Sequence, residues 1–387
     1  LELEIAMRRE VDAASADAHT RGARRFALLW VGGRGHAILG LWERPREHIR
    51  TQHFAFEVGL QELPGMVAAL TQRGVALRDF FQQRTVVPTV FGFIPAASIY
   101  FDDPDGHVLE PPDLWETHIE ARYRDRAMRL RRDADGLEYL EIGGRPSKMT
   151  RKGYPATLGR MGQTELAAFK PHPDKTYAAN MPFGACDRDQ RLKLLDAEGL
   201  EAAVLYPTLG ILWEAELEDA ELSQAYCRAY NRWIAEFCRG AGGRLIPIAH
   251  LSLGDPAAAA AELERAVKDG CRGGFVVPFT WARRAHGDPA HDPIFAKAVD
   301  LDVPIALHPA FEPFALRSAR FENAHRLSLL ASATAADGVR HAFTTFFDFA
   351  TFDRFPKLTL VILESGACWI GYWLDRLDGV VSATYIG

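Results

Sequence analysis

The sequence predicts an α/β protein in which buried strands and helices alternate along the second half of the chain. Strands such as LEAAVLYPT (200–208) are apolar throughout, which indicates a parallel sheet covered on both faces. Helix-forming stretches of about a dozen residues separate these strands. No GxGxxG follows a predicted strand, so a dinucleotide site is not expected, while a barrel and a doubly wound sheet both stay open.

The first hundred residues predict a mainly antiparallel sheet around one helix. Residues 24–43 contain two apolar runs broken by glycines, which is typical of a hairpin, and 52–60 form a further strand. The helix is expected at 63–75 and ends at Gly74. Residues 96–110 predict a strand, a tight Asp-Pro-Asp-Gly turn and a second strand.

The strand–helix pattern falls short of a closed barrel. The expected barrel strands are 97–102, 202–207, 245–251, 274–279, 304–309 and 358–364. A (β/α)8 barrel needs eight strands. The sequence therefore predicts a barrel that is incomplete at its C-terminus, in a chain that begins with Leu and is a fragment of a longer product. Residues 111–184 are irregular and rich in proline and glycine, and we expect an insertion over the top face of the barrel.

Composition and charge narrow the function classes. The 387 residues carry a net charge of −6, and no apolar run approaches the roughly 20 residues of a membrane helix. The N-terminus lacks the apolar core of a signal peptide. The five cysteines are scattered without a CxxC pair, which favours a reducing compartment. We therefore expect a cytoplasmic protein with a small-molecule substrate and no nucleic-acid or membrane partner; a homo-oligomer is compatible with the sequence.

Three short segments place polar side chains where strands end. Asp105 and His107 are two residues apart, so both face one side of a strand and could share a cation; a turn aspartate and a surface histidine would give the same pattern. His308 ends the apolar run VPIALH, either as a ligand or as a hydrogen-bonded core histidine. Glu364 ends VILE, where a carboxylate requires a metal ion or a salt bridge. His250 also ends a strand and is a weaker candidate.

The motifs RLKLLDAEGLEAAVLYPT, YNRWIAEFC, RLIPIAHLSL, VPIALHP and FPKLTLVILESGACWIGYWLDRLD occur in order within 103–378. Together they resemble the amidohydrolase-related branch of the amidohydrolase superfamily, which is similar to aminocarboxymuconate-semialdehyde decarboxylase and γ-resorcylate decarboxylase. The resemblance implies a (β/α)8 barrel with one divalent metal, most often zinc or manganese. By position it implies Asp105, His107 and His308 as ligands, with Asp where many members have His. Glu364 stands where these decarboxylases place a catalytic histidine, and it is the implied catalytic residue.

A second resemblance covers residues 1–110. QHFAFEV, LPGMVAALTQRGV and ASIYFDDPDGHVLE are similar to a vicinal oxygen chelate, or glyoxalase-like, domain. This implies a partial α+β domain of βαβββ order, because the family's first strand and helix would precede Leu1. Its metal ligands would be His53 and Glu110.

Both families claim DPDGHVLE at 103–110, since it is the final hairpin of one fold and the end of the first strand of the other. We expect the hairpin, with Asp105 in the turn and Glu110 on a strand beside His53. Asp-Pro-Asp-Gly is a strong type I turn sequence, and local pairing avoids a large loop-closure cost. The predicted domains are therefore 1–110, glyoxalase-like, and 111–387, the barrel.

These observations predict a metal-dependent enzyme that acts on a small organic acid, amide or lactone by hydrolysis or decarboxylation. The ion would activate water or polarise a substrate carboxylate or carbonyl, and Glu364 would be the general acid–base or an additional ligand. One alternative is a glyoxalase-like metal-dependent lyase or transferase. The other is an inactive chimeric or truncated fragment, because the two families join within a shared motif.

Overall fold

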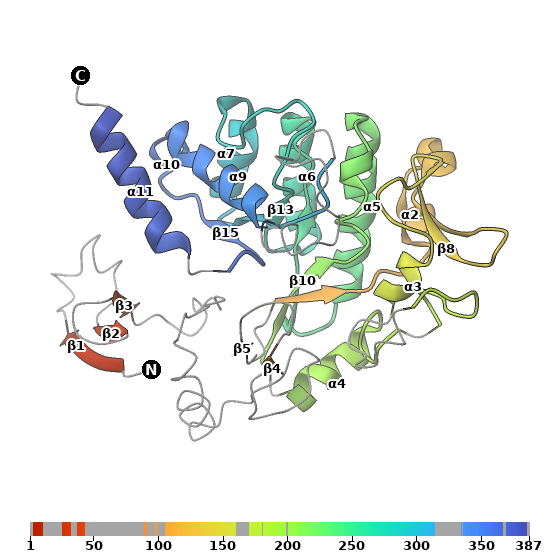
Figure 1. Ribbon diagram of the computed structural model, residues 1–387, viewed down its shortest axis with the longest axis horizontal. Coiled ribbons are helices and arrows are strands. Elements are labelled where there is room, and N and C mark those ends of the chain that lie inside the picture. The colour runs from red at the N-terminus through yellow and green to blue at the C-terminus, as the bar shows by residue number, and fades with distance from the viewer. Residues whose placement is uncertain are drawn as a thin grey trace. The chain divides into compact units, whose positions relative to one another are not determined.

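The structure of the 387-residue chain is a computed structural model, and the chain divides into the units Leu1–Asp103 and Pro104–Gly387 (Figure 1). Each unit has its own sheets. Up to residue 105, the structure describes the backbone of some segments but not their side chains. The described residues are 3–10, 25–31, 37–42, 89–90, 97–98, 105–159, 170–179, 181–198, 200–313, 334, 336–366 and 369–384.

Antiparallel strands make up the described part of the first unit. Its three-stranded sheet has the order β1 (Leu3–Glu10), β2 (Arg25–Val31) and β3 (Ala37–Trp42). The antiparallel pairing of β2 with β3 confirms the hairpin predicted at 24–43. The predicted strand 52–60, the predicted helix 63–75 and His53 lie outside the described residues.

The assignment of 97–102 to the parallel array is wrong. The strand found there, β5 (Ala97–Ser98), pairs antiparallel with β4 (Thr89–Val90) in the first unit. A short apolar run such as AASIYF suits a strand of either kind, because its composition does not specify the direction of its neighbour.

A parallel array of strands is the centre of the second unit, and it consists of two sheets. The first has the order β6 (Asp105–Val108), β10 (Ala203–Pro207) and β11 (Leu245–Pro247), and the second has the order β12 (Ala249–His250), β13 (Gly274–Val276), β14 (Ile305–Leu307) and β15 (Leu360–Ile362). Only Ile248 separates β11 from β12, so these two strands continue one course of the chain. All of these pairings are parallel, which confirms the parallel units predicted from Leu200 to Asp378.

DPDGHVLE joins the first of these sheets, so the predicted hairpin is wrong. Asp105 is not in a turn but opens β6, opposite Val204 of β10. Glu110 follows this parallel strand instead of lying in an antiparallel ladder. The turn preference of Asp-Pro-Asp-Gly is a local effect. The pairing with β10 adds a hydrogen-bonded ladder and buries Val108 and Leu109 in the core, and these gains outweigh it.

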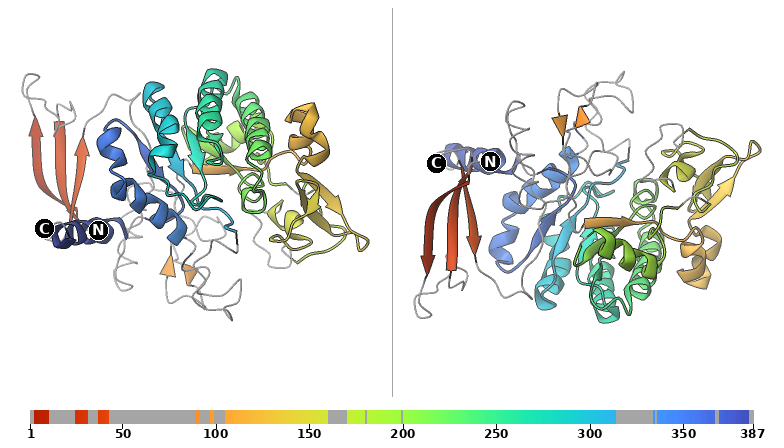
Figure 2. Two further views of the ribbon diagram at one scale, coloured as in Figure 1. Left: turned by 90° about the horizontal axis from the view of Figure 1, so that it is seen from above. Right: turned by 90° about the horizontal axis from the view of Figure 1, so that it is seen from below.

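Helices connect the parallel strands and cover the outside of the sheet (Figure 1, Figure 2). Asp219 and Asp255 start two of them, because each carboxylate accepts the N–H three residues on. Gly270, with φ 122°, ends the second of these. The helices are α4 (Arg188–Glu198), η4 (Glu214–Glu216), α5 (Ala220–Cys238), α6 (Pro256–Asp269), η5 (Pro289–His291), α7 (Asp292–Asp300), α9 (Asp337–Asp348), α10 (Thr351–Arg354) and α11 (Trp369–Thr384).

Residues 111–184 contain a small antiparallel sheet that packs beside α5. Tyr226 of α5 ties this segment down, since its hydroxyl donates to Arg126 O at 2.5 Å and accepts the N–H of Gly143 at 3.0 Å. Glu216, in the loop after β10, accepts two further backbone N–H groups of the segment. Its elements are α2 (Leu114–His118), η2 (Ala121–Arg126), β7 (Arg129–Arg132), β8 (Glu138–Ile142), β9 (Arg145–Pro146) and α3 (Tyr154–Leu158).

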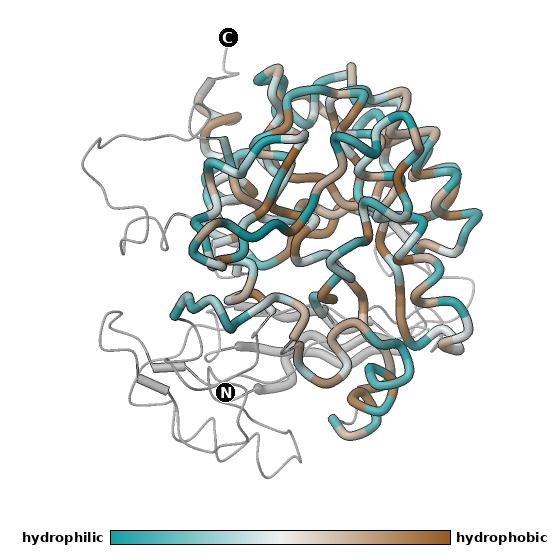
Figure 3. The backbone as a smooth tube through the Cα atoms, turned by 90° about the vertical axis from the view of Figure 1, so that its right-hand side faces the viewer, coloured by the Kyte–Doolittle hydropathy of each residue, from teal (hydrophilic) through white to brown (hydrophobic). Residues whose placement is uncertain are grey.

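One continuous core lies on both faces of the parallel sheet. Leu205, Phe275 and Leu307 of the strands are fully buried, as are Ile234 and Leu263 of the covering helices. In Figure 3 the hydrophobic colour lies mainly on inner segments of the backbone trace, and much of the hydrophilic colour lies on its outer turns. Among the described helices, none combines the length and the apolar character that crossing a membrane requires.

Folding should weaken as the pH falls, partly because of His286. This side chain is buried and its Nε2 donates to Val277 O at 2.9 Å, and burial lowers its pKa to about 4 from 6.5. The unfolded chain therefore takes up a proton that the folded chain refuses. The stability due to His286 is complete above pH 6.5 and is lost as the pH falls towards 4.

Urea unfolding at pH 7 and pH 4.5 tests this expectation. We expect the loss in unfolding free energy between the two pH values to be smaller by roughly 2 kcal/mol in H286Q than in the parent chain. H172Q, at an exposed histidine, is the control and should keep the parent's pH dependence. An unchanged pH dependence in H286Q would contradict the assignment.

Candidate functional site

The carboxyl ends of three parallel strands bring three of the predicted residues together. His107 lies in β6, His308 follows β14 directly, and Glu364 lies two residues beyond β15. One nitrogen or oxygen atom from each lies within 4.8 Å of the others. The strands β14 and β15 are adjacent and parallel, which confirms the predicted placement of His308 and Glu364. The position of His107 beside them depends on the pairing of β6 with β10.

His308 presents an unprotonated nitrogen to this group. Its Nδ1 donates to Pro309 O at 2.6 Å, which fixes the proton on that nitrogen. Its Nε2 is buried and has no hydrogen-bond partner among the described residues. Burial and the nearby His107 lower the pKa of His308 to about 4, so the ring is neutral at pH 7. A neutral imidazole with a free Nε2 lone pair is the form that binds metal ions.

His107 and Glu364 form a close pair that needs a cation between them. Nδ1 of His107 donates to Pro207 O at 2.7 Å, and its Nε2 lies 2.9 Å from Oε1 of Glu364. In the neutral ring, the Nε2 lone pair would face a carboxylate lone pair. Either a proton on Nε2, giving an imidazolium–carboxylate pair, or a metal ion removes this repulsion. The first case is the salt bridge foreseen as the alternative for Glu364, with His107 as its partner.

The backbone conformation at Glu364 directs its side chain towards His107 and His308. Glu364 has φ 45°, in the left-handed region that non-glycine residues seldom adopt, and Gly366 follows with φ 65°. The Ser365 hydroxyl donates to Leu363 O at 2.7 Å and closes the turn. Strain of this kind persists where the surrounding structure requires it, as it often does in functional sites.

Aromatic side chains lie beneath the three residues. The rings of Tyr206 and Phe275 are centred 5.3 Å and 5.8 Å from that of His308. His250 stacks on Phe275 at 4.4 Å and is fully buried. Its Nε2 lies 2.9 Å from the carboxylate of Glu214, so it has a structural partner of its own. The buried rings of Tyr206 and Phe275 pack against the His308 imidazole.

The residues present fit a divalent metal ion. Two imidazole nitrogens and a carboxylate oxygen form a ligand set that zinc and manganese accept. The unpartnered Nε2 of buried His308 is the observation that favours an ion, since an isolated buried acceptor is costly. Among the described residues, His107, His308 and Glu364 form a group of three metal-ligating side chains close enough to share an ion.

The other predicted ligands do not join this group in the described structure. Asp105 opens β6 with its backbone, and its side chain is not described. His53 is outside the described residues. Glu110 is fully buried, and its two carboxylate oxygens accept N–H groups from Thr208, Leu209 and Gly210.

Two contacts that support His107 were not foreseen. Arg191 of α4 donates from Nη2 to the carbonyl of His107 at 2.7 Å. Burial lowers the pKa of the Arg191 guanidinium, which is partly buried. An arginine on a charged helix is typical of a solvated face, so the sequence offers no signal for this role. Pro207 carried a weak signal, because it ends the apolar run of β10.

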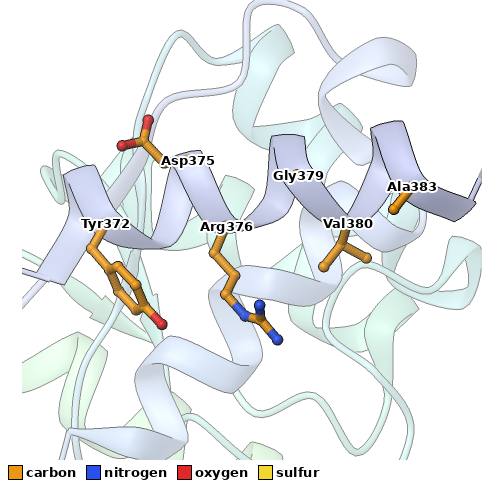
Figure 4. A pocket seen from close by; sticks show the side chains of 6 residues that line it. All are labelled: Tyr372, Asp375, Arg376, Gly379, Val380 and Ala383. Atoms are coloured by element: carbon orange, nitrogen blue, oxygen red, sulfur yellow. The ribbon is translucent and has the colours of Figure 1, made fainter.

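The hollow along α11 is a separate feature. It is lined by Tyr372, Asp375, Arg376, Gly379, Val380 and Ala383 (Figure 4). All six residues belong to one helix, and none of the three site residues lines it. It is not part of the candidate centre.

Comparison with known proteins decides the family. The sequence profile of a family described as Amidohydrolase matches residues 177–385. The chain belongs to the amidohydrolase family. The match contains His308 and Glu364 but starts after β6, so His107 enters the site through the structure.

The curated relatives include decarboxylases. A γ-resorcylate decarboxylase from Rhizobium radiobacter is 30% identical over 200 residues, which cover 49% of this chain and 59% of the relative. Decarboxylase orsB from Emericella nidulans is 31% identical over 139 residues, which cover 34% of this chain and 41% of the relative. The chain thus spans less than two thirds of the length of these relatives.

A solved structure shares the fold. An amidohydrolase from Mycobacterium avium subsp. paratuberculosis K-10 superposes with a TM-score of 0.61 and 23% identity, over 73% of this chain and 77% of that one. At this identity the likeness concerns the fold alone.

Removal of the His308 imidazole should abolish tight metal binding. We expect H308A to bind Mn²⁺ or Zn²⁺ on the order of 100-fold or more weakly than the parent, because it lacks one of the ligand atoms. Isothermal titration calorimetry measures the affinity. H250A is the matched control, since it removes another fully buried imidazole and should lower stability while leaving the affinity within a few fold. Equal losses in both variants would contradict the assignment of ligands.

Proposed function

We propose that this amidohydrolase-family chain carries a divalent metal centre and decarboxylates a small aromatic acid. The observation that carries the proposal is the convergence of His107, His308 and Glu364 from three strand ends to within 4.8 Å. We further propose that the strands belong to a (β/α)8-type barrel, which the parallel pairings from β6 to β15 support.

We assign the ion to His107 and His308, with Asp105 as a predicted third ligand and zinc or manganese as the metal; Glu364 is close enough to be an additional ligand. When bound, the ion would supply Lewis-acid polarisation of a substrate carboxylate or carbonyl, or a water of lowered pKa. His308 suits the ligand role because its proton is held on Nδ1 and its Nε2 is free. His107 suits it because Pro207 O fixes its ring in the same way.

Glu364 is the proposed proton carrier. Decarboxylation breaks the bond between the ring carbon and the carboxylate, releases CO₂ and leaves an electron pair on the carbon that requires a proton. Glu364 is 45% exposed, so it exchanges protons with solvent, and it lies at the same strand ends as the ligands. A carboxylic acid can deliver that proton and then regain one from solvent.

Aromatic side chains at the same end of the sheet support an aromatic substrate. Phe279 and Trp281 follow β13, with ring centres 6.4 Å apart in a T-shaped contact. Phe311 follows His308 by three residues and lies 6.1 Å from Tyr154 of the 111–184 segment. These rings provide flat apolar faces suited to another ring. The similarity to enzymes named γ-resorcylate decarboxylase supports the same substrate class.

For the first unit we keep the proposal of a partial glyoxalase-like domain. The antiparallel order of β1, β2 and β3 is compatible with it. Its ligand pair, His53 with Glu110, stays a prediction, and the bonds of Glu110 to the backbone at 208–210 argue for a different role of that residue.

Metal-dependent release of CO₂ from γ-resorcylate tests the proposal. We expect the Mn²⁺-loaded chain to decarboxylate it, a chelator to abolish the reaction, and added Mn²⁺ to restore it. E364Q should lower kcat by about 10²–10⁴-fold, the usual contribution of a general acid. E236Q, an exposed glutamate on α5, is the control. Turnover of a small lactone instead would favour hydrolysis, and no turnover of either by the metal-loaded chain would contradict the proposal.

A further inference from the structure

Glu110 is a buried carboxylate with an unusual set of partners. It lies three residues beyond His107 and is fully buried. Its Oε2 accepts the N–H groups of Thr208 at 3.2 Å and Leu209 at 2.9 Å, and its Oε1 accepts that of Gly210 at 2.8 Å. Consecutive N–H groups that converge in this way form a concave anion-binding site. The anion bound here is a side chain of the chain itself.

These bonds continue the link between β6 and β10 beyond the end of the sheet. The ladder ends where Val108 pairs with Pro207. Just past it, the hydroxyl of Thr208 donates to Val108 O at 3.0 Å, and the Glu110 carboxylate then takes up the next N–H groups of the loop. Two strand ends that would otherwise diverge are therefore held together.

The loop is shaped for this contact. A Cβ atom on Gly210 would lie 2.6 Å from Cβ of Pro207 and 3.2 Å from Oε1 of Glu110, so a side chain at this position would displace both. Burial raises the pKa of Glu110, and the three N–H groups act against that rise. All three contacts require acceptor oxygens, which a carboxylate supplies and an amide supplies only in part.

The same loop holds the ring of His107. Pro207, which directly precedes the three N–H groups, accepts from Nδ1 of His107 at 2.7 Å. The backbone of His107 is therefore fixed by β6, and its ring is fixed by the loop that Glu110 binds. Any loosening of Glu110 would displace the carbonyl and the imidazole together, and metal–ligand distances tolerate only about 0.2 Å.

We propose that Glu110 is a positioning residue for the metal centre, which locks the ends of β6 and β10 so that Nε2 of His107 faces His308 and Glu364. This inference rests on the proposed metal site. It differs from the ligand role expected for Glu110 from the glyoxalase-like resemblance, because here Glu110 acts through His107 and does not contact the ion.

The substitution E110Q tests the proposal. In the glutamine, the amide NH₂ would face at least one of the three backbone N–H donors, so at least one of the three hydrogen bonds would be lost. We expect E110Q to bind Mn²⁺ about 10–100-fold more weakly than the parent, the usual effect of losing a group that orients a ligand. E138Q is the matched control: Glu138 is also a buried carboxylate and accepts the N–H of Tyr177, but it lies on β8. It should lower the melting temperature and leave Mn²⁺ affinity within about twofold of the parent.

A double-mutant cycle separates positioning from general loosening. If Glu110 acts through His107, E110Q should weaken Mn²⁺ binding in the parent but add little in H107A. T208V provides a milder change that removes the bond to Val108 O with little change in shape, and it should weaken binding several-fold even if E110Q fails to fold.

The outcomes distinguish this inference from the proposed function. Equal Mn²⁺ affinity in the parent, E110Q and T208V would overturn the positioning role while leaving the metal site intact. The same fold-loss from E110Q in the parent and in H107A would also overturn it. A parent chain that binds no Mn²⁺ would overturn the proposed function and this inference with it.

Discussion

The parallel pairing of β6 with β10 is the constraint on which the candidate site depends. It sets His107 opposite Tyr206, on the face of the sheet where Tyr206 contacts the His308 ring. A slip by one residue would turn His107 to the opposite face. His308 and Glu364 are brought together by β14 and β15, but the third group comes from a segment more than two hundred residues away in sequence.

Burial differs between two of the three side chains, His308 and Glu364. His308 is 1% exposed, which keeps its ring neutral and its Nε2 available. Glu364 is 45% exposed and stays in contact with solvent protons. The site thus combines a buried imidazole, His308, that suits a metal ion with a solvent-exposed carboxylate, Glu364, that suits proton transfer. The difference follows from the position in the sheet, since β14 lies between β13 and β15 and contacts α9, whereas Glu364 and Gly366 in the turn after β15 are exposed.

Glu110 illustrates how the same residue type can serve two different purposes. A glutamate at a strand end indicates either a ligand or a structural acceptor, and the residues around it in sequence do not decide between them. What decides is a loop a hundred residues away, whose three N–H groups converge on the carboxylate. Because an ionised group without partners is costly to bury, those N–H groups and the burial of Glu110 depend on each other.

The sequence by itself determined the parallel units after Leu200 and the placement of His308 and Glu364 at neighbouring strand ends, because uniformly apolar runs and the residues that end them are local features. Only the tertiary structure decided whether DPDGHVLE forms a hairpin or a parallel strand. Its turn preference is written in four adjacent residues, whereas its parallel pairing depends on a distant strand. Arg191 and the loop at 208–210 could not be identified from the sequence for the same reason, and the signal that Pro207 carried was weak. Their effect on His107 is a contact across the sheet edge, and no period or motif in the chain records it.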